Sequence, residues 1–103
     1  MKSVILHQIL SAVAEICEIN ENEIVSHVKQ QDVVDARTIF VYSCLKYGFP
    51  AATVAKYIHR SRICSVRDYY DRYGEMRKQS NAFKYLSNEV VKKLAETMPS
   101  DDR

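Results

Sequence analysis

The chain has 103 residues, of which 47% are hydrophobic and 27% charged, which is typical of one globular domain. Its two glycines and two prolines argue against a β-sandwich or barrel, because such folds need special backbone angles at many turns. The sequence has neither glycine-rich phosphate-binding motif, G-x-x-x-x-G-K-[ST] or G-x-G-x-x-G, which excludes a nucleotide-hydrolysing domain built on them. We expect a cytoplasmic protein without membrane contact, since no apolar run approaches the roughly 18 residues of a membrane span.

Charge is unevenly distributed along the chain. The formal net charge is +2, yet residues 1–36 carry a net −4 and residues 56–78 a net +4. A basic segment of this kind attracts polyanions even in a nearly neutral protein. The same pattern is also typical of a solvated helix with ion pairs along its surface, so charge alone leaves both interpretations open.

The first half of the chain predicts three helices. Apolar residues recur at helical spacing over residues 5–17, which indicates an amphipathic helix. Asn20 is a good capping residue, and it predicts a short second helix that runs to about Lys29. After a loop, Asp32 should cap a third helix through Tyr47. Its β-branched residues make a strand conceivable, but its length and the helical recurrence of its apolar residues favour a buried central helix.

The next segment predicts a short helix, a tight connection and a longer helix. Gly48 suits a left-handed C-terminal cap, and Pro50 suits the first position of a helix over residues 51–58. Ser61 has the chemistry to cap a longer helix over residues 62–78.

A final helix is expected over residues 81–97. Its buried side chains should be Phe83, Leu86, Val90, Val91 and Leu94. Together the elements predict one all-α, six-helix domain over residues 1–98, with a frayed tail at residues 99–103.

Residues 50–78 have the outline of a helix-turn-helix. In that motif the N-terminal end of the second helix enters the major groove, and the first helix braces it across the backbone. Arg60 and Arg62 would be the principal contacts, because an arginine can fork onto guanine or phosphate. Ile63 and Ser65 would be secondary readers, through a thymine methyl or a hydrogen bond. The predicted partner is double-stranded DNA.

The order and lengths of the six elements resemble the C-terminal DNA-binding domain of the bacterial replication initiator DnaA, whose fold is similar to that of the Trp repressor. The resemblance covers about residues 5–95 and is strongest over three stretches: 9–15, 34–39 and 50–66. Within the family's signature G-G-R-D-H-T-T-V, Arg60 is identical. The Asp-His-Thr trio with which the family reads DNA is replaced here by Ser61, Arg62 and Ile63.

The resemblance implies sequence-specific binding of duplex DNA in replication initiation or its regulation, with a target that the changed trio leaves open. Lys29 falls on the family's minor-groove position, in a loop that is less basic than the family's. Lys29, Gln30 and Lys56 would position the DNA backbone, with weaker salt dependence because fewer phosphates are contacted.

Other kinds of site have little support. The three histidines and three cysteines offer no C-x-x-C or H-x-x-x-H pair, so neither zinc nor another cofactor is expected. No acid pair or activated nucleophile stands out, so we expect neither catalysis nor a small-molecule substrate. Cys64 lies among arginines at a helix start, which raises the hypothesis of a redox-sensitive thiol. Tyr69, Tyr70 and Tyr73 fit core packing better than base stacking.

Two other functions stay open. One is a helical protein-interaction module on the same scaffold, and the other is a helix-turn-helix transcription regulator that dimerises to read two half-sites. Charge reversal at Arg60 and Arg62 separates the first from DNA binding, and sedimentation separates a monomer from a homodimer.

Overall fold

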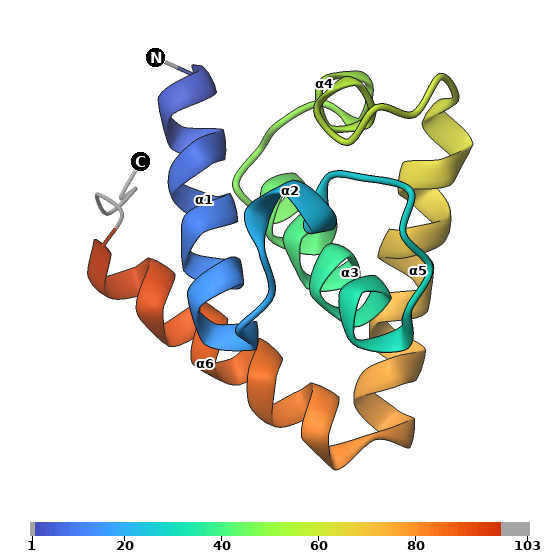
Figure 1. The fold of residues 1–103 in the computed structure, drawn as a ribbon. Helices are drawn as coiled ribbons and strands as arrows, with labels where there is room; N and C mark the ends of the chain where they lie inside the picture. The colour runs from blue at the N-terminus through green and yellow to red at the C-terminus, as the bar shows by residue number, and fades with distance from the viewer. Residues whose placement is uncertain (1, 98–103) are drawn as a thin grey trace.

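The computed structural model describes residues 2–97, and every regular element in that range is an α-helix. In chain order the helices are α1 Lys2–Cys17, α2 Glu21–Ile24, α3 Gln31–Lys46, α4 Ala51–Tyr57, α5 Ile63–Gln79 and α6 Asn81–Thr97. The predicted all-α, six-helix domain is therefore confirmed (Figure 1). The tail expected to fray at residues 99–103 lies outside the described residues.

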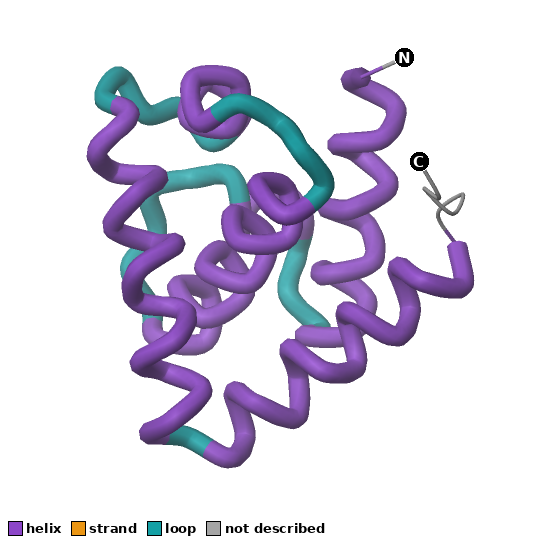
Figure 2. The backbone as a smooth tube through the Cα atoms, turned by 180° about the vertical axis from the view of Figure 1, so that it is seen from behind, coloured by secondary structure: helices purple, strands orange, loops and turns teal. Residues whose placement is uncertain are grey.

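Helix α3 is the central element of the fold. It contacts every other helix, and Figure 2 shows it from behind between α5 on one side and α1 on the other. Ile39, Phe40, Val41 and Cys44 are at most 1% exposed, which means that α3 is buried on several sides. Burial around much of the helix explains why most of its residues are apolar, and the helical interpretation of this segment is confirmed.

Helix α1 lies on the side of α3 opposite α5, and α6 runs from the end of α5 to α1 and contacts both (Figure 1). Lys93 of α6 pairs with Glu15 of α1 at 3.2 Å between Nζ and Oε1. The expected burial of α6 is confirmed for Phe83, Val90 and Leu94, and Leu86 is half-buried. The prediction for Val91 is wrong, because this side chain is 55% exposed. It follows a fully buried valine, and one step along a helix turns it toward solvent.

Helix α2 is shorter than predicted: it ends at Ile24 rather than near Lys29. In a longer helix the carbonyls of Glu23 and Ile24 would accept from amides four residues later. Here both carbonyls accept hydrogen bonds from the guanidinium of Arg37 instead. Asn20 does cap the helix, since its side chain accepts from the Asn22 amide at 2.8 Å. The remaining residues of this stretch form a loop, residues 25–30.

The starts of two other helices differ slightly from the predictions. Asp32 is not the cap of α3, because the helix begins at Gln31 and Gln30 takes the cap position, two residues earlier than predicted. Asp32 lies in the first turn, where its negative charge suits the helix dipole. Pro50 precedes α4 as its cap residue rather than its first helical residue. Gly48 has the predicted left-handed conformation, with φ of 92°.

Candidate nucleic-acid interface

Helix α4, a five-residue turn and the start of α5 lie together at one end of the molecule (Figure 1). The turn is fixed by backbone hydrogen bonds from His59 to Lys56 at 3.1 Å and from Arg60 to Ala55 at 2.8 Å. His59 adopts a φ of 59°, a conformation that histidine accepts more readily than most side chains. Ile58 is completely buried beneath the turn, so the angle between the two helices is anchored in the core.

The start of α5 is open to solvent. Ser61, Arg62 and Cys64 are exposed, and Ile63 is 46% exposed. Ser65 is half-buried and Val66 is fully buried. Of the predicted readers, Ile63 is therefore accessible to DNA and Ser65 is less accessible. The prediction that Ser61 caps the helix is wrong, because the helix begins at Ile63 and Arg62 is the cap residue.

Arg60 does not share this exposure. One guanidinium nitrogen, Nη1, donates to the carbonyl of Ile58 at 2.9 Å and to that of Ser26 at 3.3 Å, and the same nitrogen lies 3.4 Å from His27 Nε2. The other terminal nitrogen donates to the hydroxyl of Tyr69 at 3.3 Å. Arg60 and Arg62 were expected to act as a pair at the tip, but Arg60 is half-buried and hydrogen-bonded, whereas Arg62 is exposed. Arg60 ties the turn to the loop of residues 25–30.

Arg37 ties the same loop to the core. It is 1% exposed and donates to the carbonyls of Ile24, Glu23 and Val28 at 2.7, 3.0 and 2.9 Å. Its remaining nitrogen donates to the Tyr69 hydroxyl at 3.4 Å, so that hydroxyl accepts from two arginines. Sequence reasoning missed this network, because the acceptors are mainly backbone carbonyls whose positions depend on the fold.

The pKa of Tyr69 reflects this environment. Burial of the hydroxyl raises its pKa, but hydrogen bonds from Arg37 and Arg60 and the positive charge of both residues outweigh that effect. The pKa of Tyr69 therefore lies below its ordinary value. Tyr69 is half-buried, Tyr73 is buried, and Tyr70 is 42% exposed, so the core interpretation of these tyrosines is confirmed except for Tyr70.

Lys29, Gln30 and Lys56, the predicted backbone contacts, are all exposed. Lys29 and Gln30 belong to the loop that Arg60 and Arg37 hold, which places them on a segment fixed to the turn. Within residues 4–97, the side chains of Lys29, Lys56 and Arg62 have no hydrogen-bond or ion-pair partner. These cations are therefore not neutralised by carboxylates of the described chain.

Acidic residues limit this basic surface. Asp68, Asp71 and Glu75 are exposed on α5. Asp71 follows Cys64 by seven residues, which places it on nearly the same helix face about 10 Å further along. The acidic side chains therefore do not turn away from the face that Cys64 occupies. Only about the first turn and a half of α5 presents an uninterrupted cationic surface.

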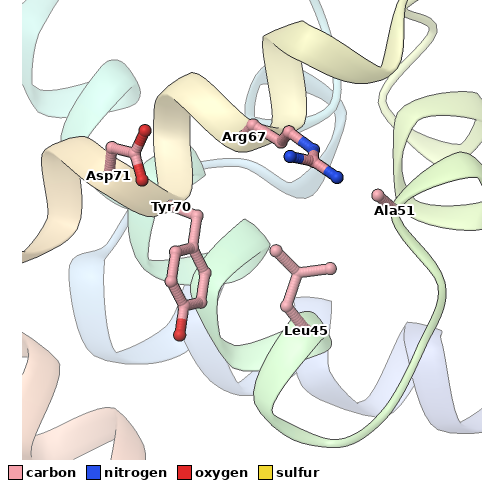
Figure 3. Close-up of a pocket in the computed structure, with 5 residues that line it drawn as sticks. All are labelled: Leu45, Ala51, Arg67, Tyr70 and Asp71. Carbon is pink, nitrogen blue, oxygen red and sulfur yellow. The ribbon is translucent and has the colours of Figure 1, made fainter.

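Arg67 belongs to this region and was not among the predicted contacts. It is exposed, and it lines a surface pocket together with Leu45, Ala51, Tyr70 and Asp71 (Figure 3). The signal in the sequence is its spacing: Arg67 follows Ile63 by four residues and so lies on the same side of the helix one turn later.

The three cysteines differ in accessibility. Cys64 is exposed, whereas burial, with a smaller effect from the charge of Asp35, raises the pKa of Cys17 to about 11. Burial also raises the pKa of Cys44 well above its ordinary value. No group of three or more metal-ligating side chains gathers anywhere in the described part of the chain. Among its helices, none has the length and apolar character needed to cross a membrane.

Comparison of the chain with protein-family models and with curated protein sequences found no match. The likeness to the DnaA domain therefore stands on the residues quoted for it.

Proposed function

We propose that the chain binds double-stranded DNA by placing the start of α5 in the major groove. The observation that supports this most is the exposed guanidinium of Arg62, which has no partner among residues 4–97 and lies at the tip of a rigid helix. Arg62 forks onto guanine or phosphate, and the neighbouring Ile63 packs on a thymine methyl. Ser61 and Ser65 add hydrogen bonds at the edge of the contact.

The acidic residues of α5 restrict how the helix approaches. Asp68 and Asp71 are repelled by phosphates, so the helix enters the groove tip first and its later turns lie outside. Lys56 on α4 and Lys29 on the loop that Arg60 holds are both exposed and contact the DNA backbone in this proposal. Gln30 adds a polar contact beside Lys29.

Arg60 has a positioning role in this proposal. A direct contact with DNA requires it to give up its hydrogen bonds to Ser26, Ile58 and Tyr69. Held where it is, it fixes the loop that carries Lys29 against the turn that carries Arg62. The two basic elements then meet DNA as one rigid surface, which lowers the entropy lost on binding.

The resemblance to the DnaA domain extends the proposal to replication initiation or its regulation. The replaced Asp-His-Thr trio indicates a target different from that family's origin boxes. Selection of bound sequences from random duplexes identifies the target.

The first test is charge reversal at Arg62, with Lys84→Glu as the matched control. Lys84 is exposed on α6, beyond the far end of α5, and the change alters the net charge equally. In fluorescence anisotropy titrations of a labelled duplex, Arg62→Glu should weaken binding by at least about tenfold, whereas Lys84→Glu should stay within about threefold. Equal losses in the two variants, or no binding by the unmodified chain at low salt, overturn the proposal.

The exposed thiol gives an independent readout without mutation. Cys64 lies beside Ile63 on the face proposed to enter the groove, while Cys17 and Cys44 are held back by burial and raised pKa values. Iodoacetamide should therefore label Cys64 first, and saturating duplex should slow that labelling strongly. An unchanged rate at saturating duplex contradicts the proposed docking.

A protein-interaction module is the second candidate, and the exposed acids Asp68, Asp71 and Glu75 favour it over an interface made only of cations. It predicts that duplex DNA neither binds at low salt nor protects Cys64. A dimeric transcription regulator instead binds DNA as a pair, and sedimentation of the complex gives its stoichiometry.

A further inference from the structure

A second contact for the DNA backbone lies in the pocket between the end of α3, the start of α4 and the middle of α5. Leu45 and Ala51 give it apolar walls, and Arg67, Tyr70 and Asp71 line it from α5 (Figure 3). The pocket thus combines a cation, an aromatic ring and aliphatic surface within one site.

Arg67 is the cation available in this pocket. Asp71 lies four residues later, a spacing at which arginine and aspartate commonly pair on a helix surface. No ion pair joins them, and in Figure 3 the guanidinium extends toward Ala51 while the carboxylate of Asp71 points elsewhere. No hydrogen bond fixes the Arg67 side chain to any other part of the described chain. Its charge is therefore open to an external anion.

Tyr70 gives the pocket a firm wall. Its ring is 42% exposed, yet it stacks on Tyr42 with 5.2 Å between ring centroids and 28° between ring planes. Tyr42 in turn stacks face to face on the buried Tyr73, at 3.6 Å. An exposed ring held by a stacked pair loses little freedom when a ligand covers it, so it offers contact area at low entropic cost.

We propose that Arg67 binds a phosphodiester of the DNA strand that passes across α4, and that the ring of Tyr70 lies under the adjoining deoxyribose. This inference rests on the proposed function and adds a specific backbone contact to it. In a helix-turn-helix the first helix crosses the backbone while the second occupies the groove, so a cation that extends from the second helix toward the start of the first meets that strand. A nucleotide backbone unit pairs an anionic phosphate with a largely apolar sugar face, which matches the guanidinium and the apolar walls. Because Asp71 repels a phosphate, the phosphate lies on the Ala51 side of the Arg67 guanidinium, away from that carboxylate (Figure 3).

The contact carries no sequence information, so a mixed-sequence duplex is a sufficient probe. The pair to compare is Arg67→Gln and Arg72→Gln: both arginines are exposed on α5, and both changes remove one positive charge. Arg72 differs in lying over the ring of Tyr69, with its guanidinium carbon 5.9 Å from the ring centroid, away from the pocket. Long-range attraction changes equally in the two variants, and only the local contact differs.

Titrations across salt concentrations measure the number of phosphates neutralised. Loss of one contact reduces the slope of log K against log salt by about 0.9. When salt rises from about 50 to 200 mM, both proteins lose affinity, and the fold-loss for Arg67→Gln should be smaller than that of the unmodified chain by a factor of about 3.5. Arg72→Gln should keep the original slope, and Arg67→Lys, which keeps the charge, should restore most of it.

The outcomes separate this inference from the proposed function. If the unmodified chain binds duplex and Arg62→Glu weakens it, but Arg67→Gln and Arg72→Gln have the same slope, the backbone contact is wrong and the function stands. If the unmodified chain does not bind duplex at low salt, both fail. Retention of the full slope by Arg67→Gln, together with weaker binding of an acidic peptide, assigns the pocket to a protein partner and overturns the inference.

Discussion

Replacement of Arg37 by methionine should destabilise the fold severely, although it removes a buried charge. Such a replacement is often neutral or stabilising when a buried ion pair is exchanged for apolar residues, because both charged partners disappear. The acceptors of Arg37 are instead the backbone carbonyls of Ile24, Glu23 and Val28, which no substitution at this position removes. The change removes this donor from the carbonyls of Ile24 and Val28, whereas the Glu23 carbonyl still accepts from the amide and the hydroxyl of Ser26.

The size of the effect follows from the burial of each acceptor. Hydrogen bonds to a charged group contribute about 1.5–3 kcal/mol each, and a buried acceptor left without a donor costs about 1–3 kcal/mol. The bond to Ile24 is fully buried, whereas the bonds to Glu23 and Val28 are partly buried and water replaces them in part. We expect Arg37→Met to lower the free energy of unfolding by about 3–4 kcal/mol. Methionine fills most of the volume, so little of this loss comes from a cavity.

Urea unfolding followed by far-ultraviolet circular dichroism measures the change. A chain of 103 residues has a stability of about 5–15 kcal/mol, so the predicted loss moves the midpoint far toward lower urea. Arg72→Met is the control, since Arg72 is exposed and its loss should stay within about 0.5 kcal/mol. A value for Arg37→Met within about 1 kcal/mol of the unmodified chain refutes the argument that the loop depends on this guanidinium.

Two further predictions concern titration and packing. The pKa of Tyr69 is lower in the folded state, so folding favours the ionised form of its hydroxyl. The unmodified chain should therefore gain stability relative to Tyr69→Phe as pH rises from the folded-state pKa to the unfolded pKa of about 10. This gain should be lost as pH falls back through the folded-state pKa. In ultraviolet titration of tyrosinate, the earliest component should be missing from Tyr69→Phe. Val90→Ala should cost about 1.5–3 kcal/mol in urea unfolding and Val91→Ala less than about 0.5 kcal/mol, because the two neighbours are 0% and 55% exposed; equal costs contradict this packing.

Periodicity predicted the longer helices at the periphery well because each buries one side against the same core, whereas α3 is buried on several sides and its length also favoured a helix. Exact boundaries were less accessible, since several polar residues near each start can cap a helix. Ser61 and Asp32 have suitable side chains, yet Arg62 and Gln30 take the cap positions without any side-chain bond. The early end of α2 was beyond sequence reasoning, because it depends on an arginine thirteen residues after Ile24.

The sequence also predicted the candidate site only in part. The sequence indicated that Arg60 and Arg62 lie together at the start of α5, and of these two only Arg62 is exposed. It did not indicate that Arg60 folds back onto Ser26, because that carbonyl lies 34 residues away in the chain. Whether an arginine is free to bind DNA depends on backbone carbonyls that only the folded chain brings close to it.

The number of basic side chains that are free to contact DNA limits the salt dependence of binding. The segment of residues 56–78 contains seven basic side chains, but Arg60 holds the loop and Arg77 donates to Ser87 and Asn88 of α6. Within the part of the chain that the structure describes, the exposed cations on or next to the helix-turn-helix that have no hydrogen-bond or ion-pair partner and that we assign to DNA are Lys29, Lys56, Arg62 and Arg67. Four phosphate contacts give a salt slope no steeper than about −3.6. A steeper measured slope requires further cations to reach the DNA, and Arg60 is the nearest one that could do so, by leaving its carbonyls as the complex forms.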